Sequence, residues 1–295
     1  MAFASIDELE GALRGADYLP DRGLATALFL SLRLGKPLLL EGEAGVGKTE
    51  AAKALARALP ARLIRLQCYE GLDVQHAVYE WNYARQLLHI RLQERDGGSA
   101  AEAEAQIFGE AFLLKRPLLQ AIAHEGRAPV LLVDEIDRSD EEFEAFLLEV
   151  LSDFQVSVPE LGTLRAPARP HVILTSNRSR DLSDALRRRC LYLWIDYPPF
   201  EKELAIVRRK VPGASDELAA EIVGLVQQLR RGKLAKVPGV SETLDWAGAL
   251  VALHAAHLQP QLVAETLGCL VKDEGDLRKV RAELDAGRLS AGSAA

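Results

Sequence analysis

The stretch GEAGVGKT at residues 42–49 decides the fold that we predict for this chain. It matches the pattern G-x-x-x-x-G-K-[ST], in which a glycine-rich loop surrounds a phosphate group with backbone N–H donors. An apolar run at residues 37–41 has the length of a strand, and the alanine- and leucine-rich run at residues 50–59 contains no helix breaker before Pro60. A strand, a glycine-rich loop and a helix in this order predict a phosphate-binding loop at the end of a buried strand.

Two side chains at the end of this stretch carry its chemistry. We expect Lys48 to contact the β- and γ-phosphates of a nucleotide, and the hydroxyl of Thr49 to hold Mg²⁺. The alternative is a glycine loop that only turns the chain, and the strand before it and the helix after it disfavour this. We therefore predict ATP and Mg²⁺ as cofactors. The predicted cofactor-binding residues are Gly42, Glu43, Ala44, Gly45, Val46, Gly47, Lys48, Thr49 and Glu50.

A second apolar run, VLLV at residues 130–133, ends in two adjacent carboxylates, Asp134 and Glu135. Beside a phosphate-binding loop, a carboxylate at the end of a strand can hold the hydration shell of the metal, and a second can polarise the attacking water. We predict that Asp134 binds the metal together with Thr49, and that Glu135 is the catalytic base. The alternative is a solvated strand end, where acids are common.

Two further polar features follow apolar runs. Residues 171–177, HVILTSN, end in Asn177, whose side chain is expected to hydrogen-bond the attacking water or the γ-phosphate; an ordinary turn asparagine is the alternative. Three consecutive arginines occupy residues 187–189, and a guanidinium keeps its charge and binds phosphate through a rigid fork. We predict that Arg189 acts on the catalytic site of a neighbouring subunit. Which of the three arginines does so stays open, and a solvated basic turn is the alternative.

The order of apolar runs predicts an α/β fold. Helical patterns separate most of the short apolar runs, so we expect a parallel sheet covered by helices on both faces. These runs are residues 62–66, 130–133, 171–176 and 191–195. After Pro198-Pro199 the strand signal fades and helical patterns dominate. We predict a nucleotide-binding core at residues 1–197, an all-helical domain at residues 198–286 and a disordered tail at residues 287–295.

The composition narrows the class of protein. The 295 residues carry a formal net charge of −7, which does not favour nucleic acid as a partner. The three cysteines, Cys68, Cys190 and Cys269, are too far apart for a zinc site and fit reduced thiols. The N-terminus has no basic region, and no apolar stretch near it approaches the roughly 20 residues that span a bilayer. We expect a cytoplasmic protein without a transmembrane segment; peripheral attachment to the inner face of the membrane is compatible with this.

Taken together, these features resemble the AAA+ ATPases, and the resemblance covers almost the whole chain. In that family residues 42–49 are Walker A, residues 134–135 end Walker B, Asn177 is sensor 1, and the helical domain is the lid. Within AAA+, QCYEGLDV at residues 67–74 and LVDEIDR at residues 132–138 are similar to MoxR proteins. Two longer stretches resemble the CoxD subgroup of MoxR. They are VYEWNYARQ at residues 78–86 and DLSDALRRRC at residues 181–190.

The resemblance implies a P-loop NTPase core with a C-terminal helical lid, assembled as a hexameric ring with nucleotide at the subunit junctions. It implies a chaperone that uses ATP hydrolysis to remodel a client protein. The client would be carbon monoxide dehydrogenase, whose molybdenum–copper centre it would help to assemble, or a related molybdenum hydroxylase. A partner that carries a metal-binding domain is compatible with this function. Residues 71–80 and 156–165 are the expected client-facing loops. Tyr69, His76 and Trp81 are candidate client contacts, with packing as the alternative.

One position departs from the pattern of the family. Many MoxR proteins contact the nucleotide through a lid arginine, called sensor 2, and Thr243 stands at the matching position of GVSET, residues 239–243. Arg231 and Lys236 are the candidates to replace that arginine.

Three other functions stay open on the residues alone. A DNA motor would show turnover that DNA stimulates and salt weakens. A small-molecule kinase would need an acceptor substrate before it released phosphate. A nucleotide switch without hydrolysis would bind ATP and release no phosphate, and an intact Glu135 disfavours it.

Overall fold

The computed structural model describes residues 3–95, 107–159 and 161–289 of the chain. The chain forms two compact units. The first comprises Met1–Glu41 and Thr49–Trp194, and the second comprises Gly42–Lys48 and Ile195–Ala295. The domain boundaries proposed from the sequence, at residues 197 and 286, stay predictions. Of the tail predicted to be disordered, residues 290–295 lie outside the described residues.

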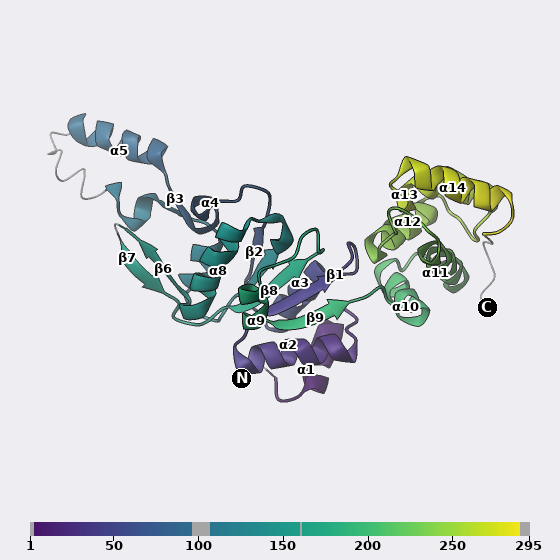
Figure 1. Ribbon diagram of the computed structural model, residues 1–295, viewed down its shortest axis with the longest axis horizontal. Helices are drawn as coiled ribbons and strands as arrows, with labels where there is room; N and C mark the ends of the chain where they lie inside the picture. Colours follow the sequence, from purple (N-terminus) through teal and green to yellow (C-terminus); the bar gives the residue numbers. More distant parts are fainter. Residues whose placement is uncertain (1–2, 96–106, 160, 290–295) are drawn as a thin grey trace. The chain divides into compact units, whose positions relative to one another are not determined.

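A five-stranded sheet forms the centre of the first unit, in the order β2-β5-β8-β1-β9 (Figure 1). Its strands are β1 (Leu38–Gly42), β2 (Leu63–Gln67), β5 (Val130–Asp134), β8 (His171–Ser176) and β9 (Leu191–Ile195). The pairs β2–β5, β5–β8 and β8–β1 are parallel, with Gln67 opposite Asp134 and Glu41 opposite Ser176. The carboxyl ends of these strands therefore meet at one edge of the sheet.

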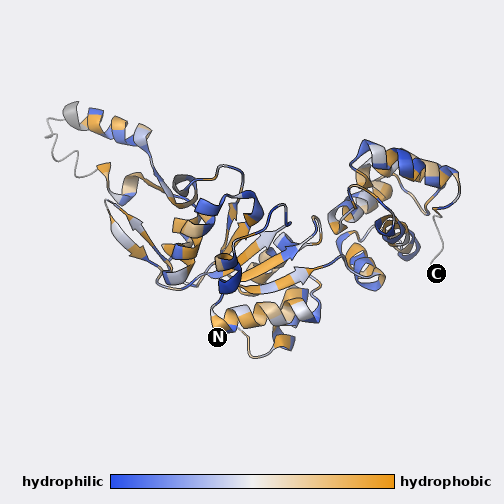
Figure 2. Cartoon of the chain, viewed as in Figure 1, coloured by the Kyte–Doolittle hydropathy of each residue, from blue (hydrophilic) through white to orange (hydrophobic). Residues whose placement is uncertain are grey.

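The composition of the central strands explains why helices cover them. Every residue of β1 and β5 is buried, although side chains on a strand alternate between its two faces. A strand buried on both sides needs a continuous apolar run, and Figure 2 shows hydrophobic residues gathered along the sheet. Burial of one leucine or valine side chain contributes roughly 1.5–3 kcal/mol. The predicted α/β fold, a parallel sheet flanked by helices, is confirmed.

Helices precede the strands of the first unit and, as predicted, separate most of them. They are α1 (Ile6–Gly15), α2 (Arg22–Leu34), α3 (Lys48–Ala58), α4 (Val74–Val78), α5 (Tyr83–Arg95), α7 (Pro117–Ile122), α8 (Glu141–Asp153) and α9 (Asp184–Arg189). The described residues of this unit also contain two 3₁₀ turns, η1 (Glu110–Phe112) and η2 (Ile136–Arg138). The buried face of α8 shares one hydrophobic core with β5 and β8. This core holds the strand ends that carry the candidate site.

Among the described residues, two small antiparallel sheets accompany the central sheet. β3 (Tyr79–Trp81) pairs with β4 (Leu113–Lys115), and β6 (Gln155–Val158) pairs with β7 (Gly162–Arg165). The β6–β7 hairpin coincides with the second predicted client loop, apart from residue 160, which lies outside the described residues. The first predicted loop, residues 71–80, contains α4 and the start of β3.

The three candidate client contacts differ in exposure. Tyr69 is 45% exposed, and His76 is exposed with its Nδ1 2.7 Å from Oδ1 of Asp73. Trp81 is only 7% exposed and stacks edge-to-face on Phe108. The ring of Trp81 belongs to the hydrophobic core. Trp81 is therefore a packing residue, and its assignment as a client contact is wrong.

Within its described residues, the second unit is helical from Phe200 to Asp285. Its helices are α10 (Phe200–Lys210), α11 (Asp216–Arg231), α12 (Val240–Ala252), α13 (Pro260–Leu270) and α14 (Glu274–Asp285). They pack around a core of their own in which Trp246 is fully buried, and its indole N–H donates to the hydroxyl of Thr266 at 2.9 Å. In the part of the chain that the structure describes, no helix combines the length and apolarity needed to cross a bilayer.

Candidate nucleotide-binding site

The glycine-rich loop adopts a backbone that other residues would resist. Gly45 has φ +76° and Gly47 has φ +95°, values that side chains with a Cβ rarely adopt. Lys48 is 6% exposed, and its ammonium donates to the carbonyl oxygens of Gly42 at 2.7 Å and Glu43 at 2.6 Å. A loop with these two glycines and a buried ammonium is suited to hold phosphate groups.

The last residue of the loop motif reaches the first of the two predicted acids. Oγ1 of Thr49 donates to Oδ1 of Asp134 at 2.9 Å, across 85 positions of sequence. Asp134 ends β5 and is 1% exposed. A hydroxyl and a carboxylate held side by side are oxygen ligands of the kind that Mg²⁺ prefers, so these two residues fit the metal that the sequence predicts.

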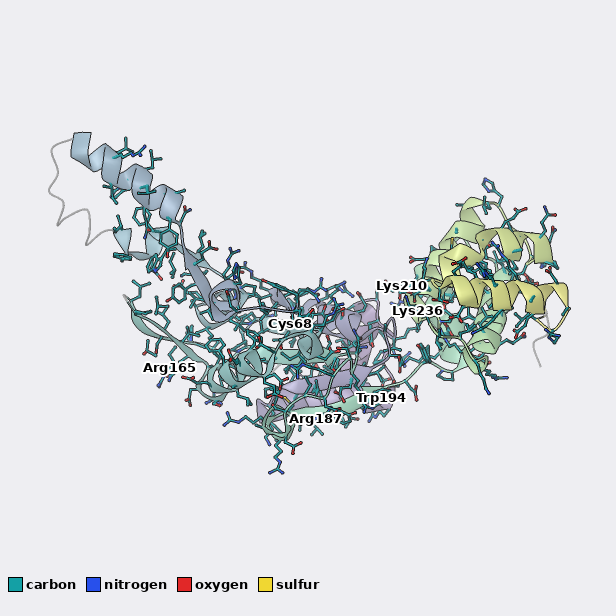
Figure 3. The ribbon with its side chains drawn as sticks, turned by 45° about the horizontal axis from the view of Figure 1, so that its top comes forward. Cys68, Arg165, Arg187, Trp194, Lys210 and Lys236 are labelled. Carbon is teal, nitrogen blue, oxygen red and sulfur yellow. The ribbon has the colours of Figure 1, made fainter. Side chains whose placement is uncertain are left out.

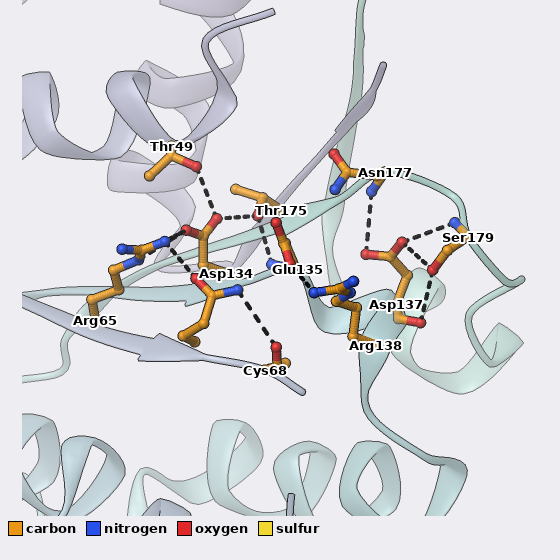
Figure 4. A network of polar contacts seen from close by, with 11 residues as sticks. Thr49, Arg65, Cys68, Asp134, Glu135, Asp137, Arg138, Thr175, Asn177 and Ser179 are labelled. Atoms are coloured by element: carbon orange, nitrogen blue, oxygen red, sulfur yellow. Dashed lines mark hydrogen bonds and ion pairs between the residues drawn. The ribbon is translucent and has the colours of Figure 1, made fainter. Parts of the chain in front are cut away.

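The remaining partners of Asp134 come from the strands on either side of β5 (Figure 4). From β8, Oγ1 of Thr175 donates to Oδ1 of Asp134 at 2.5 Å. From β2, Arg65 donates to Oδ2 through Nε at 2.9 Å and through Nη2 at 2.5 Å. Neither Arg65 nor Thr175 was identified from the sequence. The available signals were weak: Arg65 is the one charged residue inside an apolar strand, and Thr175 is a polar residue near the end of another.

Glu135 follows directly and has an unusual backbone conformation. Its φ of 55° and ψ of 50° lie in the left-handed region, where a non-glycine residue typically stores about 1–3 kcal/mol of strain. The backbone N–H of Glu135 donates to Oγ1 of Thr175 at 2.9 Å. Its carboxylate is 33% exposed, with Nη1 of Arg138 3.3 Å from Oε2. At this residue the chain leaves the extended conformation of β5 and enters η2.

Asn177 stands just after β8, at the same edge of the sheet. Its backbone N–H donates to Oδ1 of buried Asp137 at 3.2 Å, and the N–H and hydroxyl of Ser179 donate to Oδ2 at 2.8 and 2.7 Å. Asp137, which the sequence did not single out, thus fixes the turn that carries Asn177. No hydrogen bond to the side-chain amide of Asn177 is found within residues 3–95, 107–159 and 161–289.

The three arginines of α9 have different surroundings. Arg187 forms a two-pronged ion pair with buried Glu41, with Nη2–Oε1 at 2.9 Å and Nη1–Oε2 at 3.3 Å, beside β9 (Figure 3). Arg189 is exposed and donates to the carbonyl oxygen of Leu148 at 3.1 Å. Arg188 is exposed, and its side chain has no protein partner in the described ranges. Arg187 is therefore committed within its own subunit, and the other two guanidiniums are accessible.

Arg188 and Arg189 line a cavity of about 260 Å³ together with Lys36 and Arg169. The rest of its lining is apolar or neutral, without a carboxylate. Lys36, Arg169 and Cys190 stand just before β1, β8 and β9, so the cavity lies at the amino ends of these strands. Asp134 and Thr49 lie at the carboxyl ends. The basic cavity and the acids thus occupy opposite edges of the sheet.

In the second unit, the position expected for sensor 2 is enclosed. Thr243 is 0% exposed, and its hydroxyl donates to Oε1 of Glu203 at 2.9 Å. Arg230 forms a two-pronged ion pair with the same carboxylate at 2.6 and 2.7 Å. Arg231 and Lys236, the candidate replacements, are exposed, and their role stays a prediction.

Two of the cysteines are held as neutral thiols. Burial, with a smaller contribution from the negative charge of Asp134, raises the pKa of Cys68 to about 12. Burial also raises the pKa of Cys190 to about 12. Among the described residues, no group of three or more histidine, cysteine or acidic side chains gathers as a metal site would need. The interpretation of the cysteines as reduced thiols without a zinc site is compatible with this geometry.

The fold and the loop define the class of protein as a P-loop nucleotide-binding protein. A family model described as "AAA domain (dynein-related subfamily)" matches residues 37–190, just over half of the 295 residues. The chain belongs to this AAA family. It is also 26% identical, over 206 residues, to the denitrification regulatory protein NirQ of Pseudomonas aeruginosa; the match covers 68% of this chain and 69% of NirQ.

Solved structures support the fold. Two point variants of RuvB from Thermotoga maritima superpose with a TM-score of 0.51 each, at 20% and 19% identity. Each match covers 90% of this chain and 75% of the RuvB chain. A likeness at this level of identity concerns the fold alone.

Proposed function

We propose that this chain is an ATPase of the MoxR type that couples ATP hydrolysis to the remodelling of a client protein. The observation that carries the proposal is the 2.9 Å hydrogen bond between Thr49 and Asp134. Thr49 directly follows the glycine-rich loop in the sequence, and hydrolysis of a loop-bound nucleotide requires a metal-binding hydroxyl at this position. ATP is the substrate, and its phosphates would be held by the backbone amides of residues 42–49 and by Lys48.

The proposed roles of the acids follow from their surroundings. Thr49 and Asp134 would hold Mg²⁺, which when bound neutralises charge on the phosphate oxygens. Glu135 would take a proton from the attacking water, because its carboxylate is the less buried of the pair and is free of the strand's hydrogen-bonding pattern. Asn177, at the same edge of the sheet, would orient that water through its side-chain amide.

The proposed assembly is a ring of identical subunits, with six as the expected number. The exposed arginines support it. Arg189 lies at the edge of the sheet opposite to Asp134, and five strand residues at about 3.3 Å each separate the two edges. An arginine side chain does not span this distance, so Arg189 would act on the site of a neighbour. Arg188, which lines the same cavity, is the alternative.

The proposed client is a molybdenum enzyme, carbon monoxide dehydrogenase or a related hydroxylase. This rests on the resemblance of residues 78–86 and 181–190 to the CoxD subgroup. The relative NirQ is a denitrification regulatory protein, and its name does not identify a client for this chain. A cytoplasmic location and a partner with a metal-binding domain are part of the same proposal.

The deciding experiment compares three forms of the full chain in phosphate release and ATP binding. Lys48→Ala and Glu135→Gln should both abolish turnover, with Glu135→Gln still binding ATP. Normal turnover in Glu135→Gln would refute the assignment of the base. Lys53→Ala, at a half-exposed lysine on α3, is the matched control and should retain turnover.

Two further arms of this experiment separate the other functions. Phosphate release without an acceptor excludes a small-molecule kinase. Turnover that rises with added DNA and falls with salt would favour a DNA motor instead. The client is then sought by co-purification with the Glu135→Gln form from the native host. A molybdenum hydroxylase that stays bound with ATP and leaves without it is the expected result.

A further inference from the structure

Asp134 carries a counter-ion, the guanidinium of Arg65. Oδ2 of the carboxylate accepts both hydrogen bonds from Arg65, and Oδ1 accepts those from Thr49 and Thr175 (Figure 4). An ionised carboxylate has about four acceptor positions, so each is taken. In the part of the chain that the structure describes, Arg65 is the one basic side chain in an ion pair with Asp134.

The position of Arg65 follows from the strand register. In the parallel pair of β2 and β5, Gln67 lies opposite Asp134, and Arg65 lies two residues earlier. Residues two apart share one face of a strand, so Arg65 and Gln67 lie on the same face of β2. From this face the Arg65 side chain extends toward the carboxyl end of β2, where it meets Asp134. There its Nη2 also donates to Oε1 of Gln67. Gln67 thus holds the guanidinium beside Asp134.

The two partners differ in their access to water. The side chain of Arg65 is 49% exposed, whereas that of Asp134 is 2% exposed. A buried carboxylate without a compensating charge is strongly unfavourable. The half-exposed guanidinium of Arg65 supplies the compensating positive charge. The ion pair therefore offsets part of the cost of burying the charge of Asp134.

The same guanidinium opposes a metal. A divalent cation between Thr49 and Asp134 would approach the Oδ1 side of a carboxylate whose Oδ2 already faces a fixed positive charge. Between the metal and the Asp134–Arg65 pair alone, one negative charge then faces three positive charges, and the two cations repel each other, with water screening the half-exposed guanidinium. Nucleotide phosphates would add the negative charge that the two cations lack. Metal binding should therefore depend on nucleotide.

We propose that Arg65 is a resident counter-ion that makes divalent-cation binding at Asp134 conditional on bound nucleotide. This rests on the proposed function for the identity of the metal site and adds a residue to it. Arg65 is a positioning residue, because it acts through Asp134. Bound nucleotide would then control metal affinity through its charge.

The test measures Mn²⁺ binding to the full-length, nucleotide-free protein by electron paramagnetic resonance. The wild type should bind weakly, and Arg65→Gln should bind at least about 10-fold more tightly, because the repelling charge is gone. Arg65→Lys keeps the charge and should bind as weakly as the wild type. Arg62→Gln is the matched control: Arg62 precedes β2 and contacts Gln120, so Mn²⁺ affinity should not change. Adding Asp134→Asn to Arg65→Gln should remove the gained binding.

Mn²⁺ affinity in Arg65→Gln equal to that of Arg62→Gln would overturn the proposal. If Arg65→Gln does not fold, Gln67→Ala replaces it as the test variant, because it removes the Gln67 side-chain oxygen that accepts a hydrogen bond from Arg65. It should tighten Mn²⁺ binding by about 2- to 5-fold, and no gain would again overturn the proposal. A last measurement adds ADP, which should tighten Mn²⁺ binding in the wild type. The difference in Mn²⁺ affinity between the wild type and Arg65→Gln should then become smaller. If the wild type binds no ADP, the proposed function fails. The Mn²⁺ affinities measured without nucleotide still test the role of Arg65.

Discussion

The hydroxyl of Thr175 donates a hydrogen bond of 2.5 Å to Oδ1 of Asp134. The same hydroxyl oxygen accepts the backbone N–H of Glu135 at 2.9 Å. One buried side chain on β8 therefore holds both members of the acid pair that ends β5. The geometry of the candidate catalytic acids depends on the neighbouring strand as well as on their own.

Thr175→Val tests this arrangement, because valine has nearly the same shape and lacks the hydroxyl. The N–H of Glu135 loses its acceptor in a buried place, so the free energy of unfolding should fall by roughly 1–3 kcal/mol. Turnover should fall at least about 10-fold, since a displaced base loses its alignment. Phosphate release and urea denaturation measure the two effects. Thr163→Val on exposed β7 is the control, and equal turnover in both variants would contradict the role of Thr175.

The ion pair of Arg187 and Glu41 predicts a difference between adjacent arginines. Glu41 is 1% exposed, so Arg187→Met leaves a buried carboxylate without its partner. The free energy of unfolding should fall by about 3 kcal/mol. Arg188→Met removes an exposed side chain and should change it by less than about 0.5 kcal/mol. Denaturation midpoints compare the two, and similar values would show that the pair does not stabilise the core.

Complementation tests whether Arg189 acts on a neighbour. Arg189→Ala subunits retain an intact loop, and Lys48→Ala subunits retain an intact arginine, so each preparation alone should be nearly inactive. Mixed rings should regain turnover that is greatest near an equal mixture, because a restored junction needs one subunit of each kind. Lys48→Ala mixed with Glu135→Gln is the control without recovery. Mixing that restores nothing in the Arg189 series would argue for action within one subunit, or for Arg188.

The enclosed position of Thr243 predicts that an arginine there is harmful. Thr243 is fully buried beside Glu203 and Arg230, which already satisfy each other. Thr243→Arg would add a second cation and extra volume, so the free energy of unfolding should fall by roughly 3 kcal/mol or more. Lys236→Ala, on an exposed side chain, should stay within about 0.5 kcal/mol. Increased turnover with unchanged stability in Thr243→Arg would show that the position reaches nucleotide.

The raised thiol pKa values predict alkaline destabilisation. A pKa of about 12 in the folded chain, against an ordinary 9.0, means that the unfolded chain loses these protons first as pH rises. The buried neutral thiols contribute fully to the free energy of unfolding below pH 9. This contribution is lost between pH 9 and about 12, by up to roughly 1.4 kcal/mol per pH unit for each thiol. Urea denaturation across this range measures it, and Cys68→Ala should flatten the decline.

Thiol labelling at pH 8 gives an independent check. With a pKa of about 12, about one in ten thousand molecules of Cys68 or Cys190 carries the reactive thiolate. Both should react slowly in the native chain and rapidly in urea. Fast native labelling of Cys68 would contradict its burial.

Local sequence was sufficient for the features that depend on neighbours along the chain. The spacing of residues 42–49 requires no partner to be recognised, and an apolar run that ends in two acids is visible in residues 130–135. Alternation of such runs with helical patterns predicted the parallel sheet, because strands buried on both faces must be apolar throughout. These predictions concern which residues form each element.

The partners of those residues depend on strand order and register, which no local pattern specifies. Arg65 meets Asp134 because β2 pairs with β5, and Thr175 meets it because β8 lies on the other side. The choice among the three arginines of α9 likewise needed Glu41, 146 positions away in sequence from Arg187. Ion pairs and hydrogen bonds act over a few ångströms in space, so the charge balance of this site was settled when distant strands came together in one sheet.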